Sequence, residues 1–211
     1  MKKTFLCLLA AFALWTAAVC AVDVQPVGPM DSTVGFAGLN RWFHGLTGVH
    51  MGLYILTDWL SLLPVGLGLS FAGLGLCQWV RRRKLRLVDG DILALGGFYL
   101  VVLAVYLLFE KAAVNHRPVL INGCLEASYP SSTTVLVLCL GLTAIRQFSS
   151  RIRNKPLRRW VCTSLQFYTI AMVLGRLLSG VHWLSDIVGG VLISGALVAG
   201  YCWVCGCIRR R

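Results

Sequence analysis

The chain alternates long apolar runs with short polar segments, and six of the runs approach the length of a membrane-spanning helix. An α-helix needs about 20 residues to cross the hydrocarbon core of a bilayer. The six runs cover residues 4–22, 60–80, 92–109, 131–148, 160–178 and 187–208. This pattern predicts an all-α, polytopic membrane protein with six transmembrane helices in one bundle. We expect residues 1–211 to form a single membrane domain.

The first run follows Lys2 and Lys3, and it therefore also resembles a signal peptide. We expect residues 1–22 to be an uncleaved anchor, with cleavage after Ala21 as the alternative. In both cases the chain that follows emerges on the outer side of the membrane.

An outer loop is predicted over residues 23–59, before the helical core of residues 60–208. Within it, residues 34–46 carry apolar side chains at helical spacing, which indicates a helix lying in the membrane interface. The alternative for this helix is a lip through which substrate reaches the site. Asp58 stands at the mouth of the second span, where we expect it to cap the helix. The alternative is that it balances outer cations.

Composition supports a membrane protein and excludes a module that binds nucleic acid. Hydrophobic residues make up 57% of the chain and charged residues 13%, against about 25% in soluble domains. The net charge of +12 is carried by short basic runs between the apolar segments, without the basic and aromatic pattern that reads RNA or DNA. The expected partners are therefore the bilayer and its lipids.

The basic residues also predict an orientation. With the N-terminus inside, sixteen of the 20 Lys and Arg residues face the cytoplasm, which follows the positive-inside rule. We expect a multi-pass protein of the inner (plasma) membrane, with both termini in the cytoplasm. The inner group ends with Arg209, Arg210 and Arg211, and the outer side keeps Arg41, Lys111, Arg117 and Arg176.

The nine cysteines are scattered along the chain, which does not suggest a disulfide framework. Cys202, Cys205 and Cys207 lie close together, but no His or acidic residue stands beside them. We interpret them as small apolar packing residues, and not as a metal or acylation site.

Three segments with chemically active side chains fall on the outer side of this topology. They are residues 110–118 after the third run, 129–134 at the start of the fourth, and 176–186 between the fifth and the sixth. Each segment alone is more often structural than functional. Their convergence on one side of the membrane favours a functional site.

Two of these segments contain groups that bind anions. Pro130, Ser131 and Ser132 mark a helix start, where free N–H groups and the positive end of the helix dipole attract negative charge. Arg117 and Arg176 can each donate two hydrogen bonds to one phosphate.

A candidate nucleophile lies in the third segment. His182 and Asp186 are four residues apart, so on a helix they share one face. A carboxylate behind an imidazole sets its tautomer and stabilises its charged form. A histidine held in this way beside an anion site can attack phosphorus.

These segments resemble the motifs of the type 2 phosphatidic acid phosphatase family over about residues 90–208. Arg176-x5-His182-x3-Asp186 resembles the third motif, Pro130-Ser131-Ser132 the second, and Lys111 with Arg117-Pro118 the first. The resemblance implies a six-helix membrane fold and dephosphorylation through a phosphohistidine, without a metal or another cofactor. It implies His182 as nucleophile, Asp186 as its orienting partner, and Lys111, Arg117, Ser131 and Arg176 as phosphate-binding residues. We add Ser132 and Thr133, at the same helix start, to the expected phosphate-binding set.

Two departures from the family pattern affect the expected chemistry. The family usually has six residues between the Lys and the Arg-Pro of the first motif, but five separate Lys111 from Arg117. Its second motif usually reads Pro-Ser-Gly-His, and that His protonates the leaving group, whereas Ser132 and Thr133 stand here. General acid catalysis is typically worth roughly 100- to 10,000-fold. His116 is a candidate substitute, although its place beside Arg117 gives no geometric support.

The expected function is a lipid phosphate or pyrophosphate phosphatase at the outer leaflet. A polyprenyl pyrophosphate is the preferred substrate, because its leaving group departs without a strong acid; phosphatidic acid and phosphatidylglycerol phosphate come next. The first alternative is a non-catalytic family member that binds lipid phosphates. The second is a transporter, although transporters place ionisable residues near the midplane and not at helix ends. The oligomeric state is not predicted.

Overall fold

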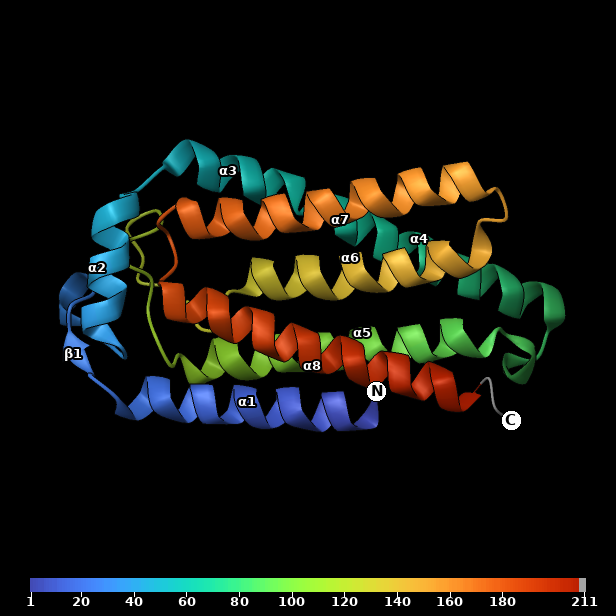
Figure 1. Ribbon diagram of the computed structural model, residues 1–211, viewed down its shortest axis with the longest axis horizontal. Coiled ribbons are helices and arrows are strands. Elements are labelled where there is room, and N and C mark those ends of the chain that lie inside the picture. Colours follow the sequence, from blue (N-terminus) through green and yellow to red (C-terminus); the bar gives the residue numbers. More distant parts are fainter. Residues whose placement is uncertain (209–211) are drawn as a thin grey trace.

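The computed structural model describes residues 1–208, and six helical segments of that range are long and apolar enough to cross a membrane. They run lengthwise in one bundle (Figure 1). The predicted all-α membrane fold is therefore confirmed. The spans are α1 (Lys2–Ala21), α3 (Met51–Leu60) continued by α4 (Leu62–Arg82), α5 (Gly90–Ala112), α6 (Ser132–Arg151), α7 (Lys155–Leu178) and α8 (Leu184–Ile208). The predicted inner residues Arg209, Arg210 and Arg211 lie outside the described range.

Shorter elements connect these spans. The strands β1 (Gln25–Pro26) and β2 (Thr33–Val34) pair antiparallel around the 3-10 turn η1 (Pro29–Asp31), and α2 (Ala37–Thr47) follows them. A second 3-10 turn, η2 (Leu85–Leu87), joins α4 to α5. The helix predicted over residues 34–46 is therefore present as α2.

The second span begins at Met51, well before the expected residue 60. The polar residues Thr57 and Asp58 interrupt the apolar run in the sequence, which hides the first part of the span. Ser61 separates α3 from α4, and its hydroxyl donates a hydrogen bond to the carbonyl of Asp58 (2.6 Å). Because Asp58 lies inside a helix, the prediction that it caps the second span is wrong.

The middle of the bundle is occupied by α6, of whose apolar window 56% is buried, compared with 11% for α1. It packs against α4, α5, α7 and α8. In contrast, α1 packs mainly along α8 and turns much of its surface outward. Leucines exposed on α4 and α5, such as Leu69, Leu100 and Leu108, suit a surface that faces lipid.

The helix α2 lies across one end of the bundle, at the left of Figure 1, together with the connections after α5 and after α7. Leu39, Trp42 and Leu46 are exposed on α2, whereas Asn40 is fully buried beneath it. This arrangement supports the interfacial helix. We call this end the site end, and the opposite end, with the α4–α5 and α6–α7 turns, the basic end.

Candidate functional site

The connection between α7 and α8 is fixed by the start of α3. Gly180 has φ +67°, and a Cβ atom at this position would lie 1.9 Å from the carbonyl oxygen of Gly48, so a side chain does not fit. The backbone N–H of His50 donates to the carbonyl of Ser179 (2.9 Å), and His44 Nε2 lies 3.1 Å from the carbonyl of Gly180. These contacts hold the segment that carries His182.

His182 lies just before α8, not within a helix as its spacing from Asp186 suggested. The two residues still meet, since Nδ1 of His182 lies 3.9 Å from the Asp186 carboxylate. The opposite ring nitrogen, Nε2, lies 3.5 Å from a guanidinium nitrogen of Arg117. The imidazole therefore has a carboxylate on one side and a cation on the other.

Burial lowers the pKa of His182 to about 4, against the raising effect of Asp186 and with the help of the Arg117 cation. His182 is 3% exposed and Asp186 is completely buried. The imidazole is therefore neutral at neutral pH, as a nucleophile must be. The distance of 3.9 Å is too long for a hydrogen bond, and such contacts often tighten only when substrate binds.

Asp186 is held by two donors that the sequence interpretation did not assign. The side-chain amide of Asn115 donates to one carboxylate oxygen (3.1 Å), and the backbone N–H of Trp183 donates to the other (3.0 Å). Asn115 lies two residues before Arg117, so its place in the same polar segment was an available signal. Hydrogen bonds to a charged group are worth about 1.5–3 kcal/mol each, so this carboxylate is firmly oriented.

The start of α8 is also capped from α2. Asn40 accepts a hydrogen bond from the backbone N–H of Ser185 (3.1 Å) and donates one to its hydroxyl (2.9 Å). On the other side, the indole N–H of Trp15 in α1 donates to the carbonyl of Ser185 (3.1 Å). Neither Asn40 nor Trp15 stands near the motifs in sequence, so no local pattern indicated these roles.

The guanidinium group of Arg176 is 2% exposed and makes contacts with α3 and α6. It donates to the hydroxyl of Thr133 (2.7 Å), and to the hydroxyl of Thr57 and the carbonyl of Tyr54 (3.3 Å each). The Asp58 carboxylate lies 3.6 Å away, so Asp58 does balance a cation of this cluster. Arg176 Nε has no hydrogen-bond partner among residues 1–208. This leaves part of the cation available to an anion.

Arg117 joins Arg176 at the same aromatic ring. The Tyr54 ring centroid lies 4.8 Å from the guanidinium carbon of Arg176 and 5.8 Å from that of Arg117. Arg117 also pairs with the half-exposed Glu126 (3.0 Å). Cations stack favourably on aromatic faces, so Tyr54 holds two like charges in one place. Sequence reasoning did not find Tyr54, which lies in the predicted outer loop.

The predicted helix start is present, because α6 begins at Ser132 after Pro130 and Ser131. Ser131 is fully buried, and its backbone N–H donates to the carbonyl of Asp186 (3.1 Å). Its hydroxyl accepts from Thr134 (3.0 Å). Ser131 therefore ties α6 to α8, while Thr133 makes the direct contact with Arg176 and Ser132 faces the cavity described below.

Two residues considered from the sequence stand apart from this cluster. Lys111 is exposed in the last turn of α5 and makes no hydrogen bond or ion pair with any described residue. His116 contributes its backbone carbonyl, which accepts a hydrogen bond from the Trp183 indole (2.7 Å). The structure thus brings together His182, Asp186, Arg117, Arg176 and Thr133.

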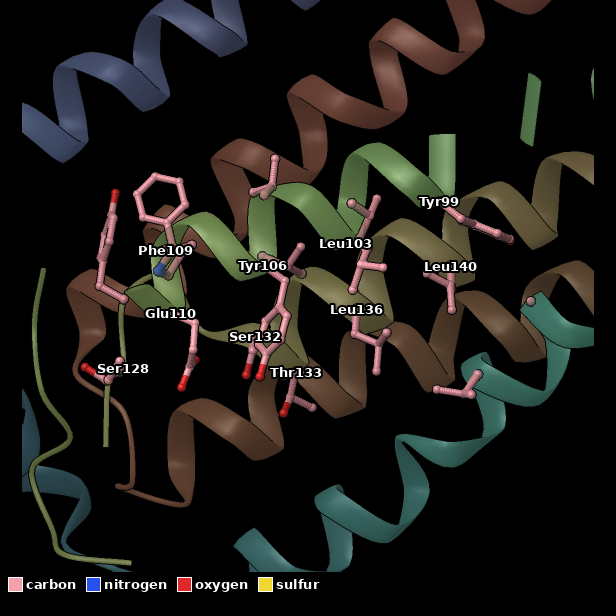
Figure 2. A pocket seen from close by; sticks show the side chains of 18 of the residues that line it. Tyr99, Leu103, Tyr106, Phe109, Glu110, Ser128, Ser132, Thr133, Leu136 and Leu140 are labelled. Carbon is pink, nitrogen blue, oxygen red and sulfur yellow. The ribbon is translucent and has the colours of Figure 1, made fainter. Parts of the chain in front are cut away.

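A cavity of about 490 Å³ lies beside the cluster, between α4, α5 and α6. Most of its wall is apolar, with Leu69, Leu103 and Leu136 among the lining residues, and Figure 2 shows Glu110, Ser128, Ser132 and Thr133 gathered at one end. His182, Arg117 and Arg176 do not line it. Thr133 both lines the cavity and contacts Arg176, so it lies at the boundary between the cavity and the cluster.

Within residues 1–208, no group of three or more His, Cys, Asp and Glu side chains is arranged to hold a metal ion. The cations that face the candidate nucleophile are guanidinium groups. Arginine matches the geometry of phosphate oxygens and remains charged at all physiological pH values.

Comparisons with known proteins agree with this arrangement. The model of the PAP2 superfamily matches residues 93–209, which is more than half of the chain. Among solved structures, the crystal structure of the first transmembrane PAP2-type phosphatidylglycerolphosphate phosphatase, from Bacillus subtilis, is similar with a TM-score of 0.59 at 15% identity. That likeness covers 98% of this chain and 96% of the other, and at this identity it concerns the fold. No curated protein sequence gives a significant match. The chain therefore belongs to the PAP2 superfamily, which places it in general among phosphatases that act on lipid phosphates.

Proposed function

We propose that the chain hydrolyses a lipid phosphate or pyrophosphate through a phosphohistidine at His182. One observation carries this proposal: the two ring nitrogens of His182 face opposite charges. Nδ1 faces Asp186 at 3.9 Å and Nε2 faces Arg117 at 3.5 Å. With its proton on the Asp186 side, the imidazole presents the Nε2 lone pair to the cationic side, where a phosphate would bind.

Each residue of the cluster has a role in this reaction. Nε2 of His182 attacks phosphorus, and the bond to the leaving oxygen breaks. Arg117 and Arg176 bind the remaining phosphoryl oxygens and stabilise the charge that they carry in the transition state. Asp186 stabilises the imidazolium that forms on attack. Water then cleaves the phosphorus–nitrogen bond and releases inorganic phosphate. In this scheme the arginines supply the positive charge, and no metal is required.

The cavity suggests how a lipid reaches this site. Its apolar wall between α4, α5 and α6 suits a hydrocarbon chain, and its polar end adjoins Arg176 through Thr133. We therefore propose that the apolar chain of the substrate occupies the cavity while its phosphate lies among Arg117, Arg176 and His182. Because no His stands at position 133, a pyrophosphate, which has a good leaving group, is the substrate that these residues favour.

Phosphate release from purified protein tests this function. The panel contains a polyprenyl pyrophosphate, the matched monophosphate, phosphatidic acid and phosphatidylglycerol phosphate, with and without EDTA. Wild-type protein is expected to release phosphate in both conditions, and the variant His182→Ala to release none. A thermal unfolding curve shows whether the variant is folded. Restoration of EDTA-treated protein by a divalent ion would contradict the metal-free scheme. Binding without hydrolysis would favour a non-catalytic lipid-phosphate-binding protein.

The location proposed for the site is the extracytoplasmic face of the inner (plasma) membrane. The basic end holds most of the basic residues, which favours its placement in the cytoplasm. Cys124 is exposed in the connection after α5, which belongs to the site end. In a variant that retains Cys124 as its only cysteine, an impermeant thiol reagent is expected to label intact cells. A matched variant whose only cysteine replaces Ser150, at the basic end, should react only after permeabilisation. The reverse result would overturn the orientation.

A further inference from the structure

Glu110 is an exposed acidic residue that stands at one end of the cavity. It stands in the last turn of α5 and lines the largely apolar cavity together with Ser128, Ser132 and Thr133. It forms no hydrogen bond or ion pair with another side chain of the described chain. Figure 2 shows its carboxyl turned to the same side as the hydroxyl groups of Ser132 and Thr133. A carboxyl group placed in this way is available to a bound ligand.

The spacing along the sequence agrees with this placement, because Glu110 stands at the usual first-motif distance from Arg117. Six residues separate Glu110 from Arg117, whereas five separate Lys111 from Arg117. Successive residues of an α-helix are rotated by roughly 100°, since 3.6 residues make one turn. Of these two neighbours, Glu110 lines the cavity and Lys111 does not.

The leaving oxygen of a bound lipid phosphate would lie on the side of the cluster that faces the cavity. In a displacement at phosphorus, the attacking and leaving atoms lie roughly in line on opposite sides. His182 is the attacking group and does not line the cavity, whereas Thr133 connects the cavity to Arg176. A lipid whose chain lies in the cavity therefore presents its leaving oxygen on the side where Glu110 stands.

We propose that Glu110 is the general acid and base of this site. In the first step, Nε2 of His182 bonds to phosphorus, and the phosphorus–oxygen bond breaks. The electron pair of that bond stays on the leaving oxygen, which takes the proton of the Glu110 carboxyl. In the second step, the Glu110 carboxylate takes a proton from the attacking water, and the phosphorus–nitrogen bond breaks. Inorganic phosphate leaves, and both His182 and Glu110 return to their starting protonation states.

The other polar groups at this end of the cavity are weaker candidates. Ser128, Ser132 and Thr133 carry hydroxyl groups, which are very weak acids, and burial raises the pKa of the Tyr129 phenol to about 12. His116 does not line the cavity.

This assignment rests on the proposed phosphatase function, and it widens the range of substrates. With an acid present, hydrolysis does not require a good leaving group, so monophosphates become substrates beside pyrophosphates. The effect of removing the acid should then depend on the leaving group, because a proton helps most where the departing oxygen is most basic.

The test compares Glu110→Gln with wild-type protein on the monophosphate and the pyrophosphate of the same lipid, under conditions in which chemistry limits the rate. The variant is expected to lose roughly 100- to 10,000-fold in kcat on the monophosphate and about tenfold or less on the pyrophosphate. The fall of the monophosphate rate at high pH should disappear in Glu110→Gln and persist in Glu110→Asp. The control Asp31→Asn removes an exposed carboxyl from η1 and should change neither rate.

Each other outcome has a defined meaning. Equal losses on both substrates, or a change in KM alone, would overturn the role of Glu110 as acid while leaving the phosphatase function intact. A higher rate in Glu110→Gln would show that the carboxylate repels the substrate, and would also overturn it. Hydrolysis of neither substrate by wild-type protein would overturn the phosphatase function itself, and this assignment with it.

Discussion

The two ends of the bundle both contain arginines, but Arg176 at the site end has different partners from Arg82 and Arg151 at the basic end. At the basic end, Arg151 binds the carboxylates of Asp89 (3.1 Å) and Asp91 (3.0 Å), and Arg82 also binds Asp89 (3.0 Å). At the site end, Arg176 has one carboxylate at 3.6 Å and otherwise contacts hydroxyl groups, a carbonyl and an aromatic ring. The side chain of Arg176 is 2% exposed and that of Arg151 is 28% exposed.

This difference supports the proposal that the site-end cluster is functional and the cluster around Arg151 is structural. Burying a cation without a close carboxylate costs free energy, and the site end bears this cost at Arg176. At the basic end, the paired charges of Arg82 and Arg151 with Asp89 and Asp91 balance. Burial there raises the pKa of Asp89, but hydrogen bonds from Gln78, Arg82 and Arg151 outweigh it and bring the pKa below its ordinary value. The weak compensation of Arg176 supports the proposal that a phosphate binds there.

Among the variants that test the comparison of the two ends, Arg176→Gln is expected to have the largest effect on hydrolysis. Loss of the charge removes a group that stabilises the phosphoryl oxygens in the transition state, and kcat is expected to fall roughly 100- to 1,000-fold. Steady-state kinetics on a lipid phosphate measures this effect. Since the variant also relieves the cost of burying a charge, its melting temperature should not fall. A large loss of stability with unchanged kcat per folded molecule would assign Arg176 to the scaffold.

A smaller effect is expected for Asn115→Leu, which leaves both arginines and His182 in place. Asp186 loses one hydrogen bond worth about 1.5–3 kcal/mol, so its carboxylate is less well oriented behind His182. We expect kcat to fall roughly 10- to 100-fold, with KM little changed. Asn115→Asp is a poor substitute, because it puts a second negative charge beside Asp186. An unchanged kcat in Asn115→Leu would mean that Trp183 alone orients the carboxylate.

The pH dependence should distinguish His182 from an ordinary histidine. Its pKa of about 4 is lower than the usual 6.5, so the neutral nucleophile persists as the pH falls from 7 to 5. On the pyrophosphate, whose hydrolysis depends little on an acid, the rate is expected to remain nearly constant over this range and to be halved near pH 4. An exposed histidine would already lose roughly 30-fold by pH 5. A halving of kcat/KM near pH 6.5, measured on protein shown to be folded, would contradict this prediction.

The smallest effect is expected at the basic end. Arg151→Gln breaks ion pairs that are partly exposed to solvent, and such pairs are worth up to about 1 kcal/mol. A melting temperature lower by about 2–4 °C is expected, with kcat and KM unchanged. Melting curves in the same detergent measure the first quantity, and phosphate release measures the second. A fall in kcat comparable to that of Arg176→Gln would remove the distinction between the two ends.

The sequence predicts the spans well because hydropathy depends on composition along one helix. It also predicts that the polar segments converge, since charge bias fixes which turns share a side. The contributions of Tyr54 and Asn40 were not predictable, because their contacts depend on how α2 and α3 fold back over the site. Lys111 is expected from the sequence because the family motif calls for Lys, whereas the rotation of α5 places its neighbour Glu110, and not Lys111, at the cavity.

The packing of α1, α2 and α3 around the start of α8 bears on how this protein diverges from its relatives. The family model begins at residue 93, yet Trp15, Asn40 and Tyr54 all precede it. The proposed reacting residues and the residues that orient them therefore belong to separate stretches of chain. The amino-acid sequences of these two stretches can diverge at different rates. A relative could keep every motif and still alter its preference through its first three helices. Chimaeras that exchange residues before and after position 93 would locate that preference.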